Sequence, residues 1–263
     1  MARRNIEGMR SLVTGASSGI GRAVAIELAN RGARCVLLAR NEERLKNVAA
    51  ECNKLQQVGQ VEIVAGDVTD PAVRKLAIEK SVIAFGGLDA VINNAGVGSF
   101  GRFADSSPER LRRIMEVNFF AAAELIRDSL PALLRGKNPI VVNVGSILGH
   151  RGIPRMHEYC TSKFALQGFS QSLRVELRGE GVDLLMVSPG TTDTEFYENV
   201  VHGRGNVPWN KGRGTPVAVV AKKTVQAMER GKREIVPNIH GRLLLWANWH
   251  VPHWVDRVLE RFA

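Results

Sequence analysis

The sequence predicts an α/β protein built on a parallel β-sheet. Short apolar runs alternate with amphipathic segments from residue 10 to residue 236, and this alternation is typical of βαβ units with right-handed crossovers. No linker, low-complexity tract or internal repeat interrupts the 263 residues. We therefore expect a single domain over 1–263, because α/β chains of this length often form one.

The first half of the chain repeats a strand–helix unit. Residues 35–39 form a continuous apolar run, as expected for a strand buried on both faces. The expected strands are 10–14, 35–39, 61–65 and 89–92, and the expected helices are one that stops at Gly32 and two over about 41–57 and 70–85.

The second half continues the same alternation. Ser107-Pro108-Glu109 is a helix start signal and predicts a long helix over 108–134. The remaining expected elements are strands at 139–144, 182–187 and 233–236 and helices at 155–179 and 216–230.

Composition limits the classes of partner. The formal net charge of +10 is compatible with nucleic acid, an anionic membrane surface or anionic ligands. Lys and Arg are spread along most of the chain instead of forming a basic patch with interleaved aromatic residues, so we expect no nucleic-acid partner. No apolar run is long enough to cross a bilayer, and no apolar segment follows the basic N-terminus as a signal peptide requires.

The three cysteines, Cys35, Cys52 and Cys160, show no metal-ligand spacing. An odd number without a pattern predicts reduced thiols in a cytoplasmic protein and no metal site. Cys160 stands next to a candidate catalytic tyrosine, but we expect it to pack as a small hydrophobe.

A glycine-rich turn follows the first predicted strand. It reads Gly15-x-x-x-Gly19-x-Gly21, which is not the usual G-x-G-x-x-G spacing. Glycines still allow the backbone to approach a pyrophosphate, and the next helix points its N-terminal N–H groups at it. The alternative is a purely structural turn. The segment contains no Gly-Lys-Ser/Thr, so it is not a P-loop.

The end of the second predicted strand indicates which dinucleotide binds. Ala39-Arg40 stands where NAD sites usually place an acid, and an arginine there accommodates a 2′-phosphate. We therefore favour NADP(H) over NAD(H), with Arg44 and Arg22 as helpers; a solvated Arg40 is the alternative. Asp67, after the third strand, is predicted either to accept from the adenine amino group or to cap the turn before the next helix.

Tyr159 and Lys163 lie four residues apart on a predicted helix, which places them on one face. A free phenol has a pKa of about 10 and transfers protons poorly at neutral pH. A nearby ammonium lowers that pKa, so the pair can form a general acid/base. The spacing alone is common, and a half-buried tyrosine beside a solvated lysine is the alternative.

Six motifs occur in order and at familiar spacings. They are Thr14-Gly15-x-x-x-Gly19-x-Gly21, Asn93-Asn94-Ala95-Gly96, Asn118, Ser146, Tyr159-x-x-x-Lys163 and Pro189-Gly190. With this set the sequence resembles the short-chain dehydrogenases/reductases from about residue 8 to residue 237. The resemblance implies a single-domain Rossmann fold: a doubly wound parallel sheet of about seven strands, with helices on both faces. It also implies a homodimer or homotetramer.

The resemblance implies a role for each catalytic residue. Tyr159 would protonate the carbonyl oxygen as hydride arrives, or act as the base in reverse. Lys163 would lower the tyrosine pKa and bind the nicotinamide ribose. Ser146 would hydrogen-bond the substrate oxygen, and Asn118 is similar to the residue that anchors a water in a proton relay to Lys163.

The resemblance also implies the cofactor contacts. Asn94 would buttress the sheet near the adenosine ribose, and Thr192 and Thr194 would hold the nicotinamide carboxamide and the pyrophosphate. The complete predicted set is Gly15, Ser17, Ser18, Gly19, Ile20, Gly21, Arg40, Asp67, Val68, Asn94, Ala95, Gly96, Tyr159, Lys163, Pro189, Gly190, Thr192 and Thr194.

Substrate choice is expected to lie in segments 97–103, 147–157 and 191–214. The last segment is rich in glycine and polar residues and is interpreted as a substrate lid. Its basic residues would suit an anionic substrate such as an acyl thioester, although a solvated loop is the alternative; they are His202, Arg204, Lys211 and Arg213.

Five apolar residues in these segments are candidates for the pocket wall, although some are expected to be core. They are Phe100, Phe103, Ile153, Met156 and Phe196.

Residues 240–263 form a helical extension with three of the four tryptophans: Trp246, Trp249 and Trp254. After Pro252 the apolar residues fall on one helical face. Tryptophan and basic residues on such a helix suit contact with a membrane interface. Packing against a second subunit or over the substrate pocket are the alternatives.

The expected function is that of an NADP(H)-dependent oxidoreductase, which interconverts a carbonyl and a secondary alcohol by hydride transfer. Its substrate would be a small to medium-sized apolar molecule, and its location cytoplasmic or peripheral at a membrane surface. Two alternatives stay open: a 3-oxoacyl-thioester reductase of lipid metabolism, and a non-catalytic NADP-binding regulator.

Overall fold

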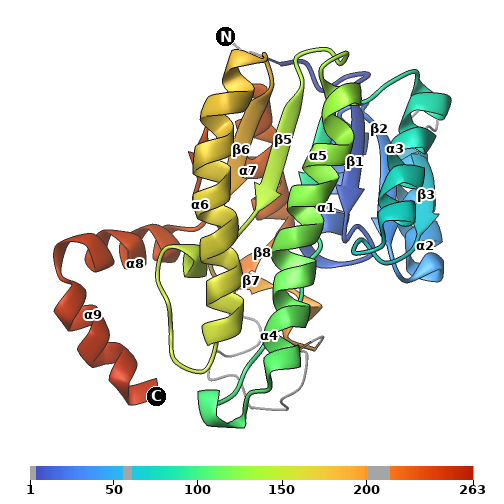
Figure 1. Ribbon diagram of the computed structural model, residues 1–263. Coiled ribbons are helices and arrows are strands. Elements are labelled where there is room, and N and C mark those ends of the chain that lie inside the picture. Colours follow the sequence, from blue (N-terminus) through green and yellow to red (C-terminus); the bar gives the residue numbers. More distant parts are fainter. Residues whose placement is uncertain (1–3, 56–60, 199, 201–213, 263) are drawn as a thin grey trace.

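A sheet of seven parallel strands forms the centre of the computed structural model, which describes residues 4–55, 61–198, 200 and 214–262 (Figure 1). The strand order is β3-β2-β1-β4-β5-β6-β9. The strands are β1 (Arg10–Thr14), β2 (Arg34–Ala39), β3 (Val61–Ala65), β4 (Ala90–Asn93), β5 (Ile140–Val144), β6 (Asp183–Val187) and β9 (Glu234–Ile235).

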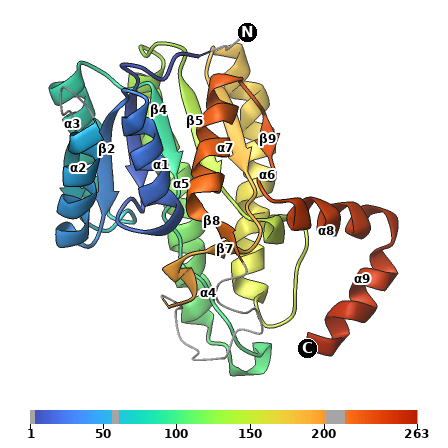
Figure 2. The same ribbon diagram turned by 180° about the vertical axis from the view of Figure 1, so that it is seen from behind.

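Helices cover both faces of the sheet, as the doubly wound prediction requires. On one face lie α3 (Pro71–Phe85), α5 (Ala121–Leu133) and α6 (His157–Gly179), in front in Figure 1. On the other lie α1 (Gly19–Asn30), α2 (Glu42–Leu55) and α7 (Val217–Glu229), in front in Figure 2. The predicted α/β fold is confirmed.

Two cores result from the alternation of side chains along each strand. In β1, Val13 packs into the cluster under α1, with Val24 and Leu28. Its neighbour Leu12 packs into the opposite cluster with Leu125 of α5. Because both faces are covered, the central strands carry apolar side chains on both faces, as the run at 35–39 indicated.

The expected helix over 108–134 is interrupted. It consists of α4 (Pro108–Met115), a π-helical turn over Glu116–Phe120, and α5. The amide of Ala121 bonds to the carbonyl of Glu116, five residues earlier. Hydrophobic spacing tolerates one extra residue in a turn, so the sequence pattern does not reveal the π-turn.

A second sheet, not predicted, pairs β7 (Thr192–Asp193) with β8 (Thr215–Pro216). Such short strands carry no periodicity to detect. The pair joins the two ends of the expected lid at 191–214. Most of that segment, with its four basic residues, lies outside the described residues.

The last two helices form an arm that stands away from the sheet (Figures 1 and 2). Helix α8 spans Ile239–His250 and α9 spans Pro252–Leu259. The break falls at Pro252, which cannot continue α8 and is well suited to the first turn of α9. None of the helices in the described ranges is long and apolar enough to cross a membrane.

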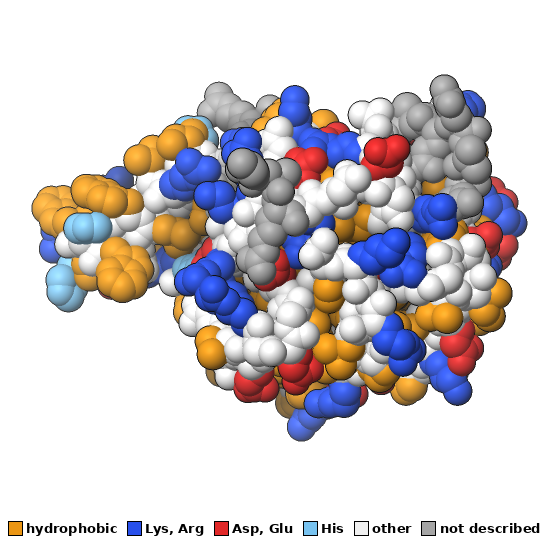
Figure 3. Space-filling model, turned by 90° about the horizontal axis from the view of Figure 1, so that it is seen from above, with side chains coloured by type: hydrophobic (Ala, Val, Ile, Leu, Met, Phe, Trp, Pro, Cys, Tyr) orange, Lys and Arg blue, Asp and Glu red, His pale blue; other side chains and the backbone are white. Residues whose placement is uncertain are grey.

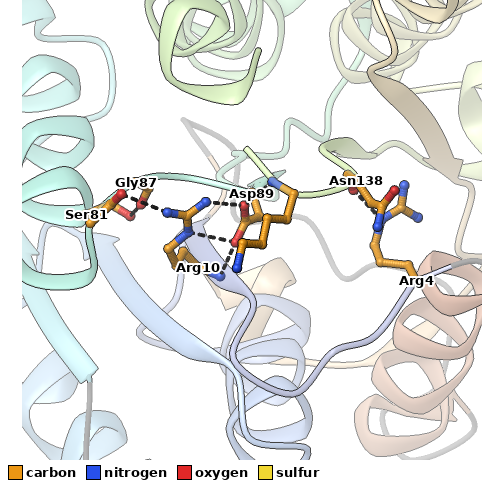
Figure 4. A network of polar contacts seen from close by, with 8 residues as sticks. Arg4, Arg10, Ser81, Gly87, Asp89 and Asn138 are labelled. Carbon is orange, nitrogen blue, oxygen red and sulfur yellow. Dashed lines mark hydrogen bonds and ion pairs between the residues drawn. The ribbon is translucent and has the colours of Figure 1, made fainter. Parts of the chain in front are cut away.

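Ion pairs hold the amino ends of the strands together, on the edge opposite the predicted site (Figure 4). Arg10 donates to both carboxylate oxygens of Asp89, at 2.8 and 2.5 Å, and Asp89 also accepts from the backbone amide of Lys137 at 2.6 Å. Arg4 donates to the Asn138 carbonyl at 2.7 Å and pairs with Asp183. These bonds tie the starts of β1, β4, β5 and β6 together.

We predict that Asp89→Ala lowers the free energy of unfolding by about 3 kcal/mol, because it leaves a partly buried guanidinium without its carboxylate. Urea titration measures the change. The matched control is Glu124→Ala, whose partner Arg127 is exposed; its effect on the free energy of unfolding should be much smaller, because exposed ion pairs contribute little. Equal effects in the two variants would contradict the prediction.

The same variant has a predicted pH dependence. Burial acts to raise the pKa of Asp89, but hydrogen bonds from Arg10 and Lys137 hold that pKa below its ordinary value. A carboxylate with a lowered folded pKa stabilises the fold at neutral pH, and the contribution is lost as pH falls from the ordinary aspartate range through the folded value. The stability gap between wild type and Asp89→Ala should therefore shrink in acid.

Candidate active site

A cavity of about 920 Å³ lies at the carboxyl ends of the strands. Residues that follow β1, β2, β3, β4, β5 and β6 all contribute to its wall, as expected for a ligand crevice in an open α/β sheet. The predicted site residues on the wall are Gly15, Ser17, Ser18, Gly19, Ile20, Arg40, Asp67, Val68, Asn94, Ala95, Gly96, Ser146, Tyr159, Lys163, Pro189, Gly190, Thr192 and Thr194.

Two predicted residues, Gly21 and Asn118, do not line the cavity. Gly21 lies under the turn: a Cβ built there would be 2.3 Å from the Asn94 side-chain nitrogen and 2.4 Å from the Gly15 carbonyl oxygen. Glycine at this position therefore supports the turn by close packing, not by contact with a ligand.

The glycine turn has the geometry of an anion site. Gly15 and Gly19 have φ values of +63° and +54°, which favour glycine. Helix α1 begins at Gly19, so its first amides point at the cavity. The Ser18 side chain makes no capping bond to this helix. Thr194 packs over the turn, with its Cγ2 3.4 Å from the Cβ position of Gly19.

Of the three arginines considered for a 2′-phosphate, two have other partners. Arg22 pairs with Glu51, and Arg44 pairs with Glu195 across the cavity wall at 2.6 Å. Arg40 is exposed at the end of β2 and lines the cavity. Among the three, Arg40 is the arginine for which no ion pair is found within the described residues.

Asp67 caps its own turn. Its Oδ1 accepts from the amide and hydroxyl of Thr69, and its Oδ2 accepts from Arg113 at 2.8 Å. Burial acts to raise the pKa of Asp67, but the bonds from Thr69 and Arg113 hold that pKa below its ordinary value. Arg113, which also lines the cavity, was not predicted, because one arginine on a polar helix face carries no distinguishing signal.

Tyr159 and Lys163 share the cavity-facing side of α6. The Lys163 Nζ lies 5.7 Å from the centre of the Tyr159 ring and donates to the Val144 carbonyl, at the end of β5, at 3.0 Å. Lys163 is 4% exposed, and burial lowers its pKa to about 8. An ammonium so placed loses hydration and is available to a polar ligand at the cavity wall.

Ser146 lies directly after β5 on the same wall. Its hydroxyl oxygen accepts from the Leu148 amide at 3.1 Å, and it faces the Pro189 carbonyl at 3.5 Å. Ser146, Tyr159 and Lys163 therefore line the same cavity, the serine from the loop after β5 and the other two from α6.

Asn118 sits in the π-helical turn and is buried behind the cavity. Its Oδ1 accepts from the Val97 amide, while its Nδ2 donates to the Val97 carbonyl and to Ser162 Oγ. It lies close to the lysine: a Cβ at Gly96 would be 3.2 Å from Asn118 Oδ1 and 3.7 Å from Lys163 Nζ. Its side chain thus braces the loop after β4 against α6.

A buried ion cluster holds the start of α6. Glu158, next to Tyr159, accepts from Arg110 Nε at 2.7 Å, from Ser99 at 2.8 Å, and from Ser106. Burial acts to raise the pKa of Glu158, but these bonds and the charge of His157 hold it at about 2. The cluster joins the 97–106 segment and α4 to the residue before the tyrosine.

The other half of the cavity is apolar. Three of the five pocket candidates, Ile153, Met156 and Phe196, line it together with Leu148. Phe100 is buried but is absent from the wall. The prediction for Phe103 is wrong: it is 78% exposed and packs edge-on against His157.

Two wall residues come from the C-terminal arm. Leu244 of α8 and Leu259 of α9 line the cavity, which agrees with the interpretation that this segment packs over the pocket. Cys160 is buried, and burial raises the pKa of its thiol, so it packs as a hydrophobe and is not poised as a nucleophile.

The chain belongs to the short-chain dehydrogenase family, whose model matches residues 10–205. Among curated relatives, it is 38% identical over 247 residues to the 11-beta-hydroxysteroid dehydrogenase-like 4A protein of Arabidopsis thaliana, covering 92% of this chain and 80% of that one. It is therefore an oxidoreductase that acts on CH–OH donors.

Solved structures show the same fold. A short-chain dehydrogenase/reductase from Burkholderia phymatum in complex with NAD matches with a TM-score of 0.85 and 23% identity, over 95% of this chain and 96% of that one. A short-chain dehydrogenase from Burkholderia cenocepacia in complex with NADP matches with a TM-score of 0.78 and 28% identity, over 89% and 97%. Three features of the site fit a nicotinamide cofactor. They are the glycine turn on the cavity wall, the Ser18 side chain that makes no capping bond to α1, and the buried Lys163.

We predict that Gly21→Ala weakens nicotinamide dinucleotide binding by more than tenfold, because the new methyl group would overlap Asn94 and Gly15 and displace the turn. Titration of cofactor fluorescence measures the affinity. The matched control is Gly168→Ala in α6, where nothing lies within 4 Å of the added Cβ. That substitution should leave affinity unchanged and stabilise the helix by up to about 1 kcal/mol. Unchanged affinity in Gly21→Ala would contradict the prediction.

Proposed function

We propose that the protein is an NADP(H)-dependent oxidoreductase that interconverts a carbonyl and a secondary alcohol, with Tyr159 as the general acid/base. The observation that carries the proposal is the buried ammonium of Lys163 beside Tyr159, on a cavity wall that also presents Ser146. Burying a cation costs free energy unless the cation is hydrogen-bonded or lies beside an opposite charge. Here it lies where a phenolate needs stabilising.

The proton steps follow from this arrangement. In reduction, Ser146 donates a hydrogen bond to the substrate oxygen, and Tyr159 donates the proton as negative charge develops there. Lys163 stabilises the phenolate that remains. One of its three donors goes to the Val144 carbonyl, and the others serve the phenolate and the ribose. The cofactor supplies the hydride in this direction and accepts it in the other.

Asn118 is proposed to act on the same pathway by anchoring a water that leads to Lys163. This role is supported because Asn118 Oδ1 and Lys163 Nζ both lie within 4 Å of the Cβ position of Gly96. The engagement of its side chain with Val97 keeps it in place.

The preference for NADP(H) rests on Arg40. It is exposed on the cavity wall at the end of β2, and Ala39 precedes it where an acid would select the 2′-hydroxyl. Of the two solved neighbours, one has NADP bound and the other NAD, so the proposed preference rests on Arg40 and Ala39 alone.

The substrate is proposed to be a small, apolar carbonyl or alcohol. Leu148, Ile153, Met156 and Phe196 support this choice, because they form an apolar wall next to the catalytic group. The Arabidopsis relative carries the name of a hydroxysteroid dehydrogenase-like protein, which is consistent with an apolar alcohol. The basic residues that would favour a 3-oxoacyl thioester lie outside the described residues, and the complete catalytic set speaks against a non-catalytic regulator.

A homodimer or homotetramer remains our prediction for the assembly. Phe120 and Phe164 are about half exposed at the contact between the π-helical turn and α6. This apolar surface is suited to a second copy of the chain.

Tyr159→Phe should lower kcat by roughly 10²- to 10⁴-fold, because the phenyl ring has no proton to transfer. Cofactor affinity should change little, because the ring still packs against Phe196 at a centroid distance of 5.4 Å. NADPH oxidation with a panel of ketones measures the rate, and cofactor fluorescence is the control. A rate like that of the wild type would remove Tyr159 from its role.

Arg40→Ala should raise the KM for NADPH by about tenfold, while the KM for NADH stays nearly constant, because only the 2′-phosphate loses its partner. The control is Arg178→Ala, an exposed arginine near the end of α6 that is absent from the cavity wall. It removes one positive charge without affecting the site. Equal changes in both KM values would show that Arg40 does not read the phosphate.

A further inference from the structure

We propose that the C-terminal arm, defined as α8 and α9, seats the enzyme on an anionic lipid surface, from which an apolar substrate enters the cavity. The arm has an inner side that contributes Leu244 and Leu259 to the cavity wall and an outer side that is apolar and exposed. The entry of substrate rests on the proposed function; the binding of lipid does not.

The outer side of α8 exposes large apolar side chains to solvent. Ile239, Leu243, Trp246 and Trp249 recur at spacings of three and four residues, and so form one stripe. Trp246 is 60% exposed and Trp249 is 85% exposed. In α9 the stripe continues with Trp254 and Val258, 64% and 51% exposed. Figure 3 shows apolar side chains gathered over this projecting part of the molecule.

The polar groups beside the stripe indicate lipid headgroups as the occupant. Arg257 lies over the Trp254 ring at 5.3 Å, and the ring of His250 stacks on Trp246 at 4.7 Å. Tryptophan next to basic groups is the pattern of side chains at the level of lipid headgroups. A bilayer interface accommodates both the ring and the charge.

The charge of the arm is complementary to anionic lipid. Together with the 3₁₀ turn over Glu260–Phe262 that follows α9, the arm carries three arginines and two acids. One of the acids, Asp256, is already paired with Arg151 of the body. Within the described part of the chain, Arg257 and Arg261 form no ion pair. The whole chain, with the arm included, has a formal net charge of +10, which attracts it to a negative surface.

The inner side links this surface to the chemistry. Leu244 follows Leu243 of the stripe and lines the cavity, and Leu259 follows Val258 and does the same. The two helices therefore present one apolar side to the cavity and the other outward. A molecule dissolved in the bilayer reaches the apolar wall of the cavity beside the arm, without crossing bulk water.

A second copy of the chain is the competing occupant. The exposed Phe120 and Phe164 lie on the body and not on the arm, so a second copy has a separate apolar surface available. The pairing of Trp246 with His250 and of Trp254 with Arg257 favours lipid headgroups as the occupant of the arm.

The test uses the full chain with vesicles of phosphatidylcholine, alone or mixed with phosphatidylglycerol. Wild type should co-sediment with the anionic vesicles and less with the neutral ones, and raised salt should weaken the association. Trp246→Ser/Trp249→Ser/Trp254→Ser should reduce the bound fraction by roughly tenfold or more. Arg257→Gln/Arg261→Gln should reduce the preference for anionic vesicles.

The matched control is Ile83→Ser/Val175→Ser, which removes exposed apolar side chains from α3 and α6; Ile83 is 85% exposed, like Trp249. It should bind vesicles as wild type does. Equal binding by the tryptophan variant, or no binding of wild type to either vesicle, overturns the proposal. Loss of self-association in the tryptophan variant, without any vesicle binding by wild type, assigns the arm to a second copy instead.

Turnover tests the route of the substrate separately. A short water-soluble ketone should be reduced equally by wild type and the tryptophan variant, because none of the three tryptophans lines the cavity. A long-chain ketone carried in anionic vesicles should be reduced several-fold faster by wild type. Equal rates on the vesicle-borne ketone overturn the route. No reduction of any ketone by wild type refutes the proposed function and leaves the vesicle-binding result standing.

Discussion

The site depends on how closely the turn after β1 approaches the turn after β4. Thr14 Oγ1 accepts from the amides of Asn94 and Ala95, both at 3.0 Å, and the Asn94 side chain donates back to the carbonyls of Thr14 and Gly15. These bonds join segments about eighty residues apart at the position where strand order reverses. They fix the width of the crevice, and only glycine at positions 15 and 21 leaves room for them.

The other constraint is the buried lysine. An ammonium out of water costs free energy unless its donors are satisfied. Lys163 offsets part of that cost by donating a hydrogen bond to the Val144 carbonyl at the end of β5. A polar ligand in the cavity can accept its other hydrogen bonds. The strand that presents the carbonyl also presents Ser146, two residues later, so one strand end organises both the lysine and the serine.

The order of elements could be predicted because each buried strand is a short apolar run between amphipathic segments. The strand expected at 10–14 is β1, and the helix expected at 155–179 begins only two residues later, as α6. Each catalytic and turn residue follows a strand or stands on the helix after it, so local pattern sufficed to place them on one edge.

Contacts between distant segments could not be predicted in this way. Leu244 and Leu259 reach the cavity because the chain folds back after β9, and no local spacing encodes that return. Phe103 looked like a pocket residue because it is aromatic in a variable loop, but the 3₁₀ turn over Phe103–Asp105 carries it outward. Arg44 forms its ion pair with Glu195, which lies 151 residues away in sequence. No local pattern in the sequence indicates this pair.

The π-helical turn over Glu116–Phe120 has a consequence for the whole length of the helix that contains it. One residue more than a regular turn rotates everything before it by about 100° relative to everything after it. Arg110 and Arg113 of α4 meet Glu158 and Asp67 in this rotated setting, while α5 keeps its apolar face on the sheet. Removal of a single residue from this turn would turn both arginines away from their partners. The extra residue therefore sets the rotation of α4, which contributes to the site, relative to α5, which contributes to the core.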